Sequence, residues 1–132
     1  MDITAAGLAL AEQIASIDPE LTAFSWNPSS VVAPAVFPKE WEIDFDGDQV
    51  MLGGDGAPVI FTVWLLVQRS DDQSGQTTVQ GYAASARTAV YLDPTLDGNV
   101  SDAFVTGMRA PGTQEYAGAD YLLLELTVRA YG

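Results

Sequence analysis

The sequence has no cysteine and no histidine, and only five of its 132 residues are basic. Without cysteine the chain can form no disulfide and no thiolate zinc site, and it offers no thiol nucleophile. Without histidine it lacks an imidazole metal ligand, a Ser-His relay and a side chain that ordinarily titrates near neutral pH. These absences exclude the most common enzyme mechanisms. We therefore predict a protein that is not an enzyme, with no catalytic residues and no cofactor.

Bases are scarce relative to acids. The chain has five Lys and Arg residues and 18 Asp and Glu residues, which gives a formal net charge of -13, although charged residues make up only 17% of the chain. A surface this negative repels the phosphates of nucleic acid. The composition therefore predicts that the protein does not wrap or hold DNA.

The sequence also lacks the patterns of a targeting or membrane segment. Its first residues, MDITAAGLALAEQIASIDPEL, have no basic region and include Asp2 and Glu12, which is unlike a secretory leader. The longest apolar run, Ala57 to Val67, is too short to cross a bilayer as a helix and is rich in β-forming residues. We expect a soluble protein that is made in the cytoplasm and has no membrane partner.

What the chain does contain is enough apolar residues for one folded domain. Hydrophobic residues make up 48% of the sequence, and a chain of this length can bury a core without disulfides, so we expect a single domain, 1–132. Apolar residues at steps of three and four predict an amphipathic helix from about Thr4 to Ile17. A second helical pattern follows Ser70 and Gln73, which have capping-box spacing, and extends to about Tyr91.

Strand patterns fill most of the remaining chain. EWEIDFD, residues 40–46, alternates apolar and acidic residues and predicts a half-buried strand. PVIFTVWLLVQRS, residues 58–70, is apolar on both alternating faces, which is typical of a central strand. Two more strands are predicted over Val100 to Arg109 and Asp120 to Tyr131, the last with strict alternation.

Prolines limit the structure between the first helix and the first long strand. Pro28, Pro34 and Pro38 prevent a helix there and leave room only for a short strand at a sheet edge. The order of elements then predicts the fold class: an α+β domain in which two helices pack on one face of a mainly antiparallel sheet.

The segment DFDGDQVMLGGDG, residues 44–56, suggests a calcium loop because Asp44, Asp46 and Asp48 have the spacing of the first three ligands of an EF-hand. Gln49 stands where the EF-hand glycine belongs, and Asp55 stands where its bidentate glutamate belongs. The preceding residues also alternate like a strand, whereas an EF-hand needs a helix. An acidic hairpin formed by these aspartates is the better interpretation, and a metal site is the alternative.

Three other residues are candidates for contacts with a protein partner. If the helices cover one face of the sheet, either Ile60, Thr62, Trp64 and Leu66 of the central strand or else their neighbours face outward, as an apolar surface of the kind that binds proteins. Arg129 lies on the polar face of the last strand. As one of four arginines in an acidic chain, it is a candidate for a carboxylate of a neighbouring subunit.

Several segments carry a likeness to a known family. They are an N-terminal amphipathic helix followed by PAVFP (34–38), VQRSDDQSG (67–75) leading into a helix, LDPTLDGNVSDAFV (92–105) before a strand, and the closing strand GADYLLLELTVRAYG (118–132). In this order of elements the chain resembles the tail-terminator, or tail-completion, proteins of long-tailed, siphovirus-like bacteriophages, especially those of actinobacterial hosts. Related neck proteins and small tail proteins share parts of the pattern.

The resemblance implies a structural virion protein that is assembled in the host cytoplasm. Such a subunit closes into a ring, commonly a hexamer, on the head-proximal end of the tail tube. The ring would contact the major tail tube protein and the head-tail connector or stopper protein, while DNA passes through without being held. We expect the acidic hairpin with Asp44, Asp46, Asp48 and Asp55 to face the bore or a neighbouring ring. The alternatives are a head-tail connector or stopper component, and a calcium- or ligand-binding domain that uses residues 44–56.

Overall fold

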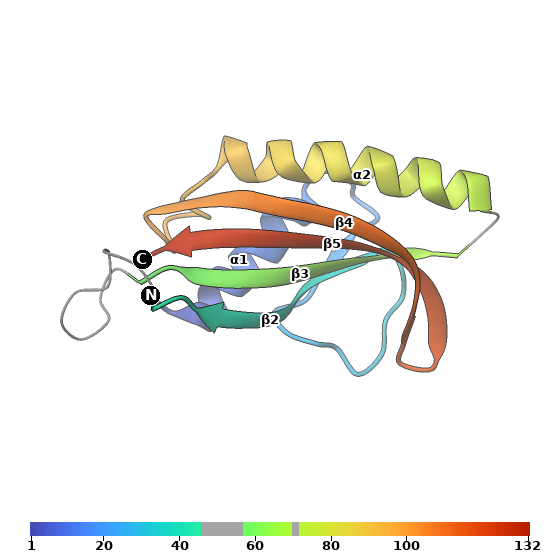
Figure 1. The fold of residues 1–132 in the computed structure, drawn as a ribbon, viewed down its shortest axis with the longest axis horizontal. Helices are drawn as coiled ribbons and strands as arrows, with labels where there is room; N and C mark the ends of the chain where they lie inside the picture. The colour runs from blue at the N-terminus through green and yellow to red at the C-terminus, as the bar shows by residue number, and fades with distance from the viewer. Residues whose placement is uncertain (46–56, 70–71) are drawn as a thin grey trace.

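The computed structural model describes residues 1–45, 57–69 and 72–132, and within them the chain forms two helices and five strands (Figure 1). In chain order these elements are α1 (Ile3–Ala15), β1 (Thr22–Ala23), β2 (Ala35–Ile43), β3 (Val59–Gln68), α2 (Asp72–Leu92), β4 (Asp102–Tyr116) and β5 (Ala119–Tyr131).

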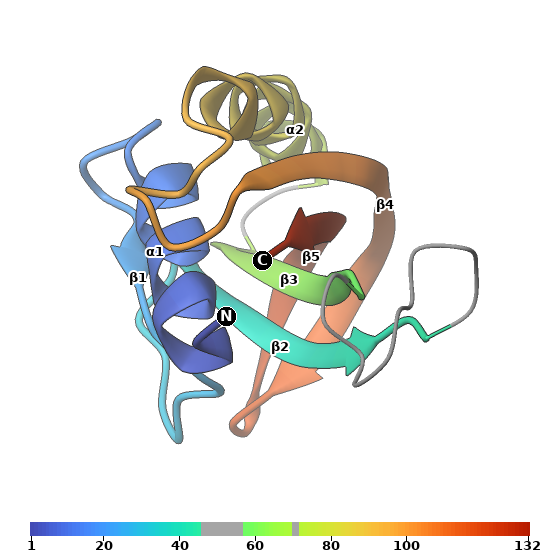
Figure 2. The same cartoon turned by 90° about the vertical axis from the view of Figure 1, so that its left-hand side faces the viewer.

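The strands form one sheet in the order β1-β2-β3-β5-β4. Only β1 and β2 pair in parallel, and the other neighbours are antiparallel. Both helices lie on the same side of the twisted sheet, α1 over the β1–β2 end and α2 along β4 (Figure 2). The predicted fold class is therefore confirmed, including the central place of the apolar strand β3. In the described part of the chain, neither helix combines the length and apolarity that a bilayer crossing requires.

Helix α1 follows the predicted apolar stripe. Asp2 caps its start by accepting a hydrogen bond from the Ala5 amide at 3.0 Å, which satisfies one of the free amides of the first turn. Leu10 and Ile14 are fully buried against the sheet. The helix ends at Ala15, two residues before the predicted end, and Ile17 is only partly buried.

The main core lies between the helices and the sheet. Alternate residues of β3 and β5 point into it, because successive side chains of a strand face opposite sides. Its fully or nearly fully buried strand residues include Phe61, Val63, Leu65, Leu124, Leu126 and Val128. The alternation predicted for the last strand is thus confirmed.

Strand β2 is longer than the short strand that the prolines led us to expect. It runs from Ala35 to Ile43 and contains Pro38, whereas the sequence predicted only a short edge strand before residue 40. Proline is tolerated here because β1 covers only Ala35 and Val36, and because the register with β3 shifts between Pro38 and Glu40.

Strand β4 also extends beyond its predicted end at Arg109. It continues through Pro111 to Tyr116, with register shifts between Val105 and Gly107 and between Arg109 and Gly112. The link to β5 is a tight turn in which Ala117 and Gly118 have φ values of 51° and 85°, as a two-residue hairpin loop requires. Most of APGTQEYAGAD, which looks like a loop in the sequence, is therefore paired as the two arms of a hairpin from Gly112–Leu123 to Tyr116–Ala119.

Two glycines of α2 give a matched test of how this helix packs. A Cβ on Gly75 would clash with Leu122 Cδ1, whereas a Cβ on Gly81 would meet nothing within 4 Å. We expect Gly81→Ala to raise the free energy of unfolding by up to about 1 kcal/mol through helix propensity. Gly75→Ala has the same propensity gain but overpacks the core, so it should be about 1–3 kcal/mol less stable than Gly81→Ala in urea unfolding. Equal stabilities would contradict the packing of α2 on Leu122.

Candidate functional site

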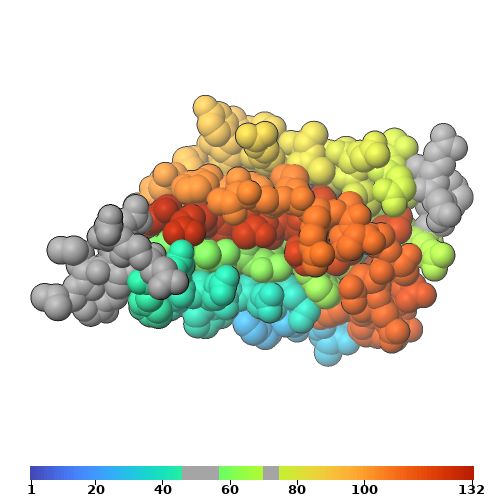
Figure 3. Space-filling model, in the orientation of Figure 1, coloured from blue at the N-terminus to red at the C-terminus, as the bar shows by residue number. Residues whose placement is uncertain are grey.

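The side of the sheet that faces away from the helices is the candidate site. We call it the outer face. Alternate residues of β3 lie on it, and each is paired with a residue of β5: Ile60 with Arg129, Thr62 with Thr127, Trp64 with Glu125, and Leu66 with Leu123. Strands β2, β3, β5 and β4 lie side by side across this face (Figure 3).

A charged network lies at the centre of the outer face. Glu125 accepts hydrogen bonds from Arg109 Nε at 2.8 Å, from Arg109 Nη2 at 3.3 Å and from Trp64 Nε1 at 3.1 Å. The Lys39 ammonium lies 5.1 Å from the centroid of the Trp64 ring. The hydrogen bond from Arg109 is the largest cause that lowers the pKa of Glu125 below its usual value. Glu125 on β5 thus joins Arg109 on β4 to the Trp64 side chain on β3.

The lowered pKa of Glu125 predicts how stability depends on pH. A carboxylate whose pKa is depressed in the folded state stabilises the fold above its unfolded pKa and loses that contribution as pH falls through the folded pKa. We expect Glu125→Gln to have a lower melting temperature than the wild type at pH 7, with a gap that narrows toward pH 3. Glu42→Gln, at an exposed glutamate, serves as the control and should change little at any pH. A gap that stays constant with pH would contradict the role of the pair.

Arg129 forms its contacts within its own chain. Its Nη2 donates to Asp44 Oδ2 at 3.0 Å, and its Nε donates to the Tyr131 hydroxyl at 2.9 Å. The Asp44 amide also donates to the Pro58 carbonyl at 3.0 Å. These bonds close the base of the connection between the antiparallel strands β2 and β3. Whether Arg129 also contacts a neighbouring subunit stays a prediction.

The acidic hairpin itself falls mostly beyond what the structure describes. Asp46, Asp48 and Asp55 lie outside the described residues, so the hairpin and the alternative metal site at these positions stay predictions. Asp44 is described and pairs with Arg129. Within residues 1–45, 57–69 and 72–132, no cluster of three or more acidic side chains is placed to hold a metal ion.

The predicted exposed apolar surface around Trp64 and Leu66 is only partly correct. Both residues do face away from the helices, but Leu66 is fully buried in a second, smaller core with Phe37 and Leu123. Trp64 is half-buried at its margin. The expectation that Leu66 is exposed is therefore wrong.

The cover over this second core comes from the segment between β1 and β2 and from the β4–β5 hairpin. The Tyr116 hydroxyl donates to the carbonyl of Pro28, and the Tyr121 hydroxyl donates to the carbonyl of Val31 at 3.3 Å. These long-range contacts hold residues 24–34 across the end of the sheet. They could not be inferred from the local sequence because they join residues about ninety positions apart.

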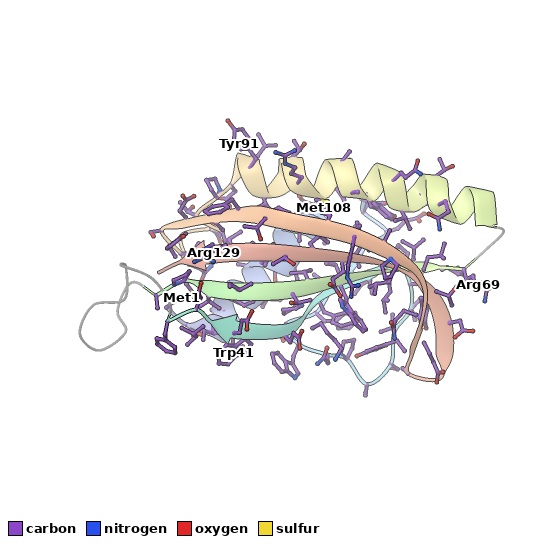
Figure 4. All side chains as sticks on the ribbon, in the orientation of Figure 1. Met1, Trp41, Arg69, Tyr91, Met108 and Arg129 are labelled. Carbon is purple, nitrogen blue, oxygen red and sulfur yellow. The ribbon has the colours of Figure 1, made fainter. Side chains whose placement is uncertain are left out.

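Sequence reasoning missed the apolar side chains that are exposed at the two edges of the sheet. At the β4 edge, Tyr91, Leu92 and Phe104 are 81%, 73% and 42% exposed. At the β2 edge, Trp41 is 42% exposed. Tyr91 and Trp41 lie at opposite edges of the molecule (Figure 4). A signal was available for Tyr91 and Leu92, which are large apolar residues that follow Val90 but fall off the buried stripe of α2.

Comparisons with known proteins give little more. No protein-family model and no curated protein matches the chain. Among solved structures, it is similar to a chain described as "Virion of native gene transfer agent (GTA) particle", with 14% sequence identity, a TM-score of 0.37 and 100% of both chains covered. A likeness this distant does not assign a function.

Proposed function

We propose that this chain is a structural protein of a phage-like virion, specifically the subunit of a tail-terminator ring. The observation that carries the proposal is the placement of exposed aromatic side chains, with Tyr91 and Phe104 at the β4 edge and Trp41 at the β2 edge. A head-to-tail ring needs two different surfaces on each subunit, because each contact joins unlike patches. Support also comes from the sequence segments that resemble tail-terminator proteins.

In this role the ring would cap the head-proximal end of the tail tube and stop its polymerisation. It would then bind the head-tail connector or stopper protein. The net charge of -13 per subunit suits a bore through which DNA slides, because negative walls do not hold phosphate. We propose that residues 44–56, whose base is closed by Arg129 and Asp44, face that bore or a neighbouring ring.

The test uses the purified protein with the major tail tube protein of the same particle. We expect closed rings in negative-stain images, and we expect substoichiometric amounts to shorten tubes that polymerise in vitro. A connector or stopper component would leave tube length unchanged, which would overturn the terminator role. A calcium-dependent rise in melting temperature, without rings, would favour the calcium-binding alternative.

The proposed role of residues 44–56 is tested by a separate variant. Replacing Asp44, Asp46 and Asp48 with asparagine removes three charges at nearly constant size. We expect altered assembly, tail length or DNA ejection in particles that carry this variant. Unchanged values for all three would show that the segment does not have the proposed role.

A further inference from the structure

Residues 24–34, which connect β1 to β2, form a loop whose two ends are held close together. We call this loop the strap. Strand β1 pairs with Ala35 and Val36, and the Phe24 amide donates to the Val36 carbonyl at 3.0 Å. Leu21, just before β1, and Val36 are both buried in the main core. A loop with its ends fixed side by side can move without disturbing the elements that it joins.

Little backbone pairing holds the strap itself. Among the residues that the structure describes, no backbone–backbone hydrogen bond involves residues 25–33. One attachment near the start of the strap comes from a side chain, because Asn27 Nδ2 donates to the Lys39 carbonyl at 3.1 Å. The position of the strap therefore depends on side-chain contacts.

Two tyrosines of the β4–β5 hairpin make the remaining attachments. The Tyr116 hydroxyl donates to the Pro28 carbonyl, and the Tyr121 hydroxyl donates to the Val31 carbonyl at 3.3 Å. Figure 1 shows the strap as a light-blue loop beside this hairpin. Burial raises the pKa of Tyr116, which keeps its hydroxyl protonated as a donor.

The strap covers only the second core, which the sheet separates from the main core. Of its large apolar side chains, Phe24 and Val31 pack against the second core, and both are only partly buried. Trp26 and Val32 are 52% and 84% exposed. Segments with few buried apolar contacts open at a lower free energy than the whole domain.

We propose that the strap, held closed by Tyr116 and Tyr121, lifts off the outer face as a unit while the rest of the domain stays folded. Lifting frees the strap backbone, and the gain in chain entropy opposes the cost of exposing apolar surface. It uncovers three side chains that are buried when the strap is closed, namely Phe37, Leu66 and Leu123. The main core stays intact, because it lies on the other side of the sheet. This inference does not depend on the proposed ring.

The first experiment uses the absence of native cysteine and two neighbouring leucines of β3. Leu65 and Leu66 are both fully buried, Leu65 in the main core and Leu66 in the second core. Each is replaced singly with cysteine, and reaction of the thiol with a chromogenic disulfide reagent is followed at urea concentrations below the unfolding midpoint. When closing is faster than reaction, the rate reports the population of the state that exposes the thiol.

We expect Leu66→Cys to react at least about tenfold faster than the global unfolding of the same variant allows. Its urea dependence should be weak, because lifting the strap exposes little surface. Leu65→Cys should react only through global unfolding, with a steep urea dependence. Each rate is compared with the global stability of its own variant, so a difference in the cost of the two substitutions does not affect the result.

Two outcomes of this experiment would overturn the proposal. One is a Leu66→Cys variant that reacts only through global unfolding, with the same steep urea dependence as Leu65→Cys. The other is an equally weak urea dependence in both variants, because the whole domain would then loosen instead of the strap alone.

The second experiment tests the two tyrosines. Adding Tyr116→Phe or Tyr121→Phe to Leu66→Cys removes one hydroxyl and should speed the thiol reaction about two- to tenfold, the usual effect of one hydrogen bond. The same changes should not alter how Leu65→Cys reacts relative to its global unfolding. Tyr91→Phe, at a tyrosine that is 81% exposed on α2, is the control and should have no effect. Equal rates in all three tyrosine variants would show that these hydroxyls do not hold the strap closed.

Discussion

Replacing Phe37 with alanine is expected to lower the free energy of unfolding by about 3–5 kcal/mol. The side chain is fully buried in the second core on the outer face. The centroid of its ring lies 5.3 Å from the ring centroid of Tyr116 and 6.4 Å from that of Trp64. Truncation removes apolar burial and leaves a cavity that the paired strands cannot close. A loss of this size is a large part of the roughly 5–15 kcal/mol that stabilises an ordinary domain. Urea unfolding followed by tryptophan fluorescence measures it.

Phe45→Ala is the matched control for this prediction. It makes the same chemical change at a side chain that is 58% exposed, so its effect should stay within about 0.5 kcal/mol. If Phe37→Ala were as mild as Phe45→Ala, residues 24–34 would not form the cover that seals the second core. Earlier proteolysis within these residues in Phe37→Ala would support that cover directly.

Leu96→Ala is expected to cost about 2–5 kcal/mol, the second large effect. Leu96 is fully buried in the main core although it lies in the turn between α2 and β4. It has a φ of 48°, and Asp97 and Gly98 follow with φ values of 58° and 80°. Asp93 holds this turn by accepting a hydrogen bond from the Asp97 amide at 2.9 Å. The turn thus uses a left-handed backbone to point a leucine inward.

Glycine at the same position separates the two contributions. Leu96→Gly loses the same side chain, but glycine adopts a positive φ without the strain of roughly 1 kcal/mol that alanine bears. We therefore expect Leu96→Gly to be at least as stable as Leu96→Ala in thermal unfolding, whereas glycine is ordinarily the more destabilising replacement. Leu92→Ala, at a leucine that is 73% exposed, should change stability little. A Leu96→Gly variant clearly less stable than Leu96→Ala would contradict the left-handed turn.

Local periodicity predicted the elements that have one consistent partner. The stripe of α1 and the alternation along most of β5 reflect burial against the main core, and the apolar run of β3 reflects burial on both of its faces, so the sequence records all three directly. The ends of β2 and β4 were not predicted, because Pro38 and Pro111 look like breakers. Both are accommodated at sheet edges with register shifts, which depend on the neighbouring strand.

The candidate site was less predictable than the fold. Arg129 and Trp64 were identified as unusual residues, but their intrachain partners, Asp44 and Glu125, lie 85 and 61 positions away. The exposure of Tyr91 depends on how α2 lies along β4. No local pattern encodes that placement.

The sequence alone determined that thiol and imidazole side chains are absent, that the charge is strongly negative, and in which order helices and strands follow one another. Composition needs no structure to be read, and periodicity depends only on residues close together in the chain. The tertiary structure alone decided that Leu66 is covered, that Arg129 closes the base of the acidic segment, and that aromatic side chains stand exposed at opposite edges. These features follow from contacts between residues far apart in the chain, where packing and strand register, rather than local preference, set which groups meet.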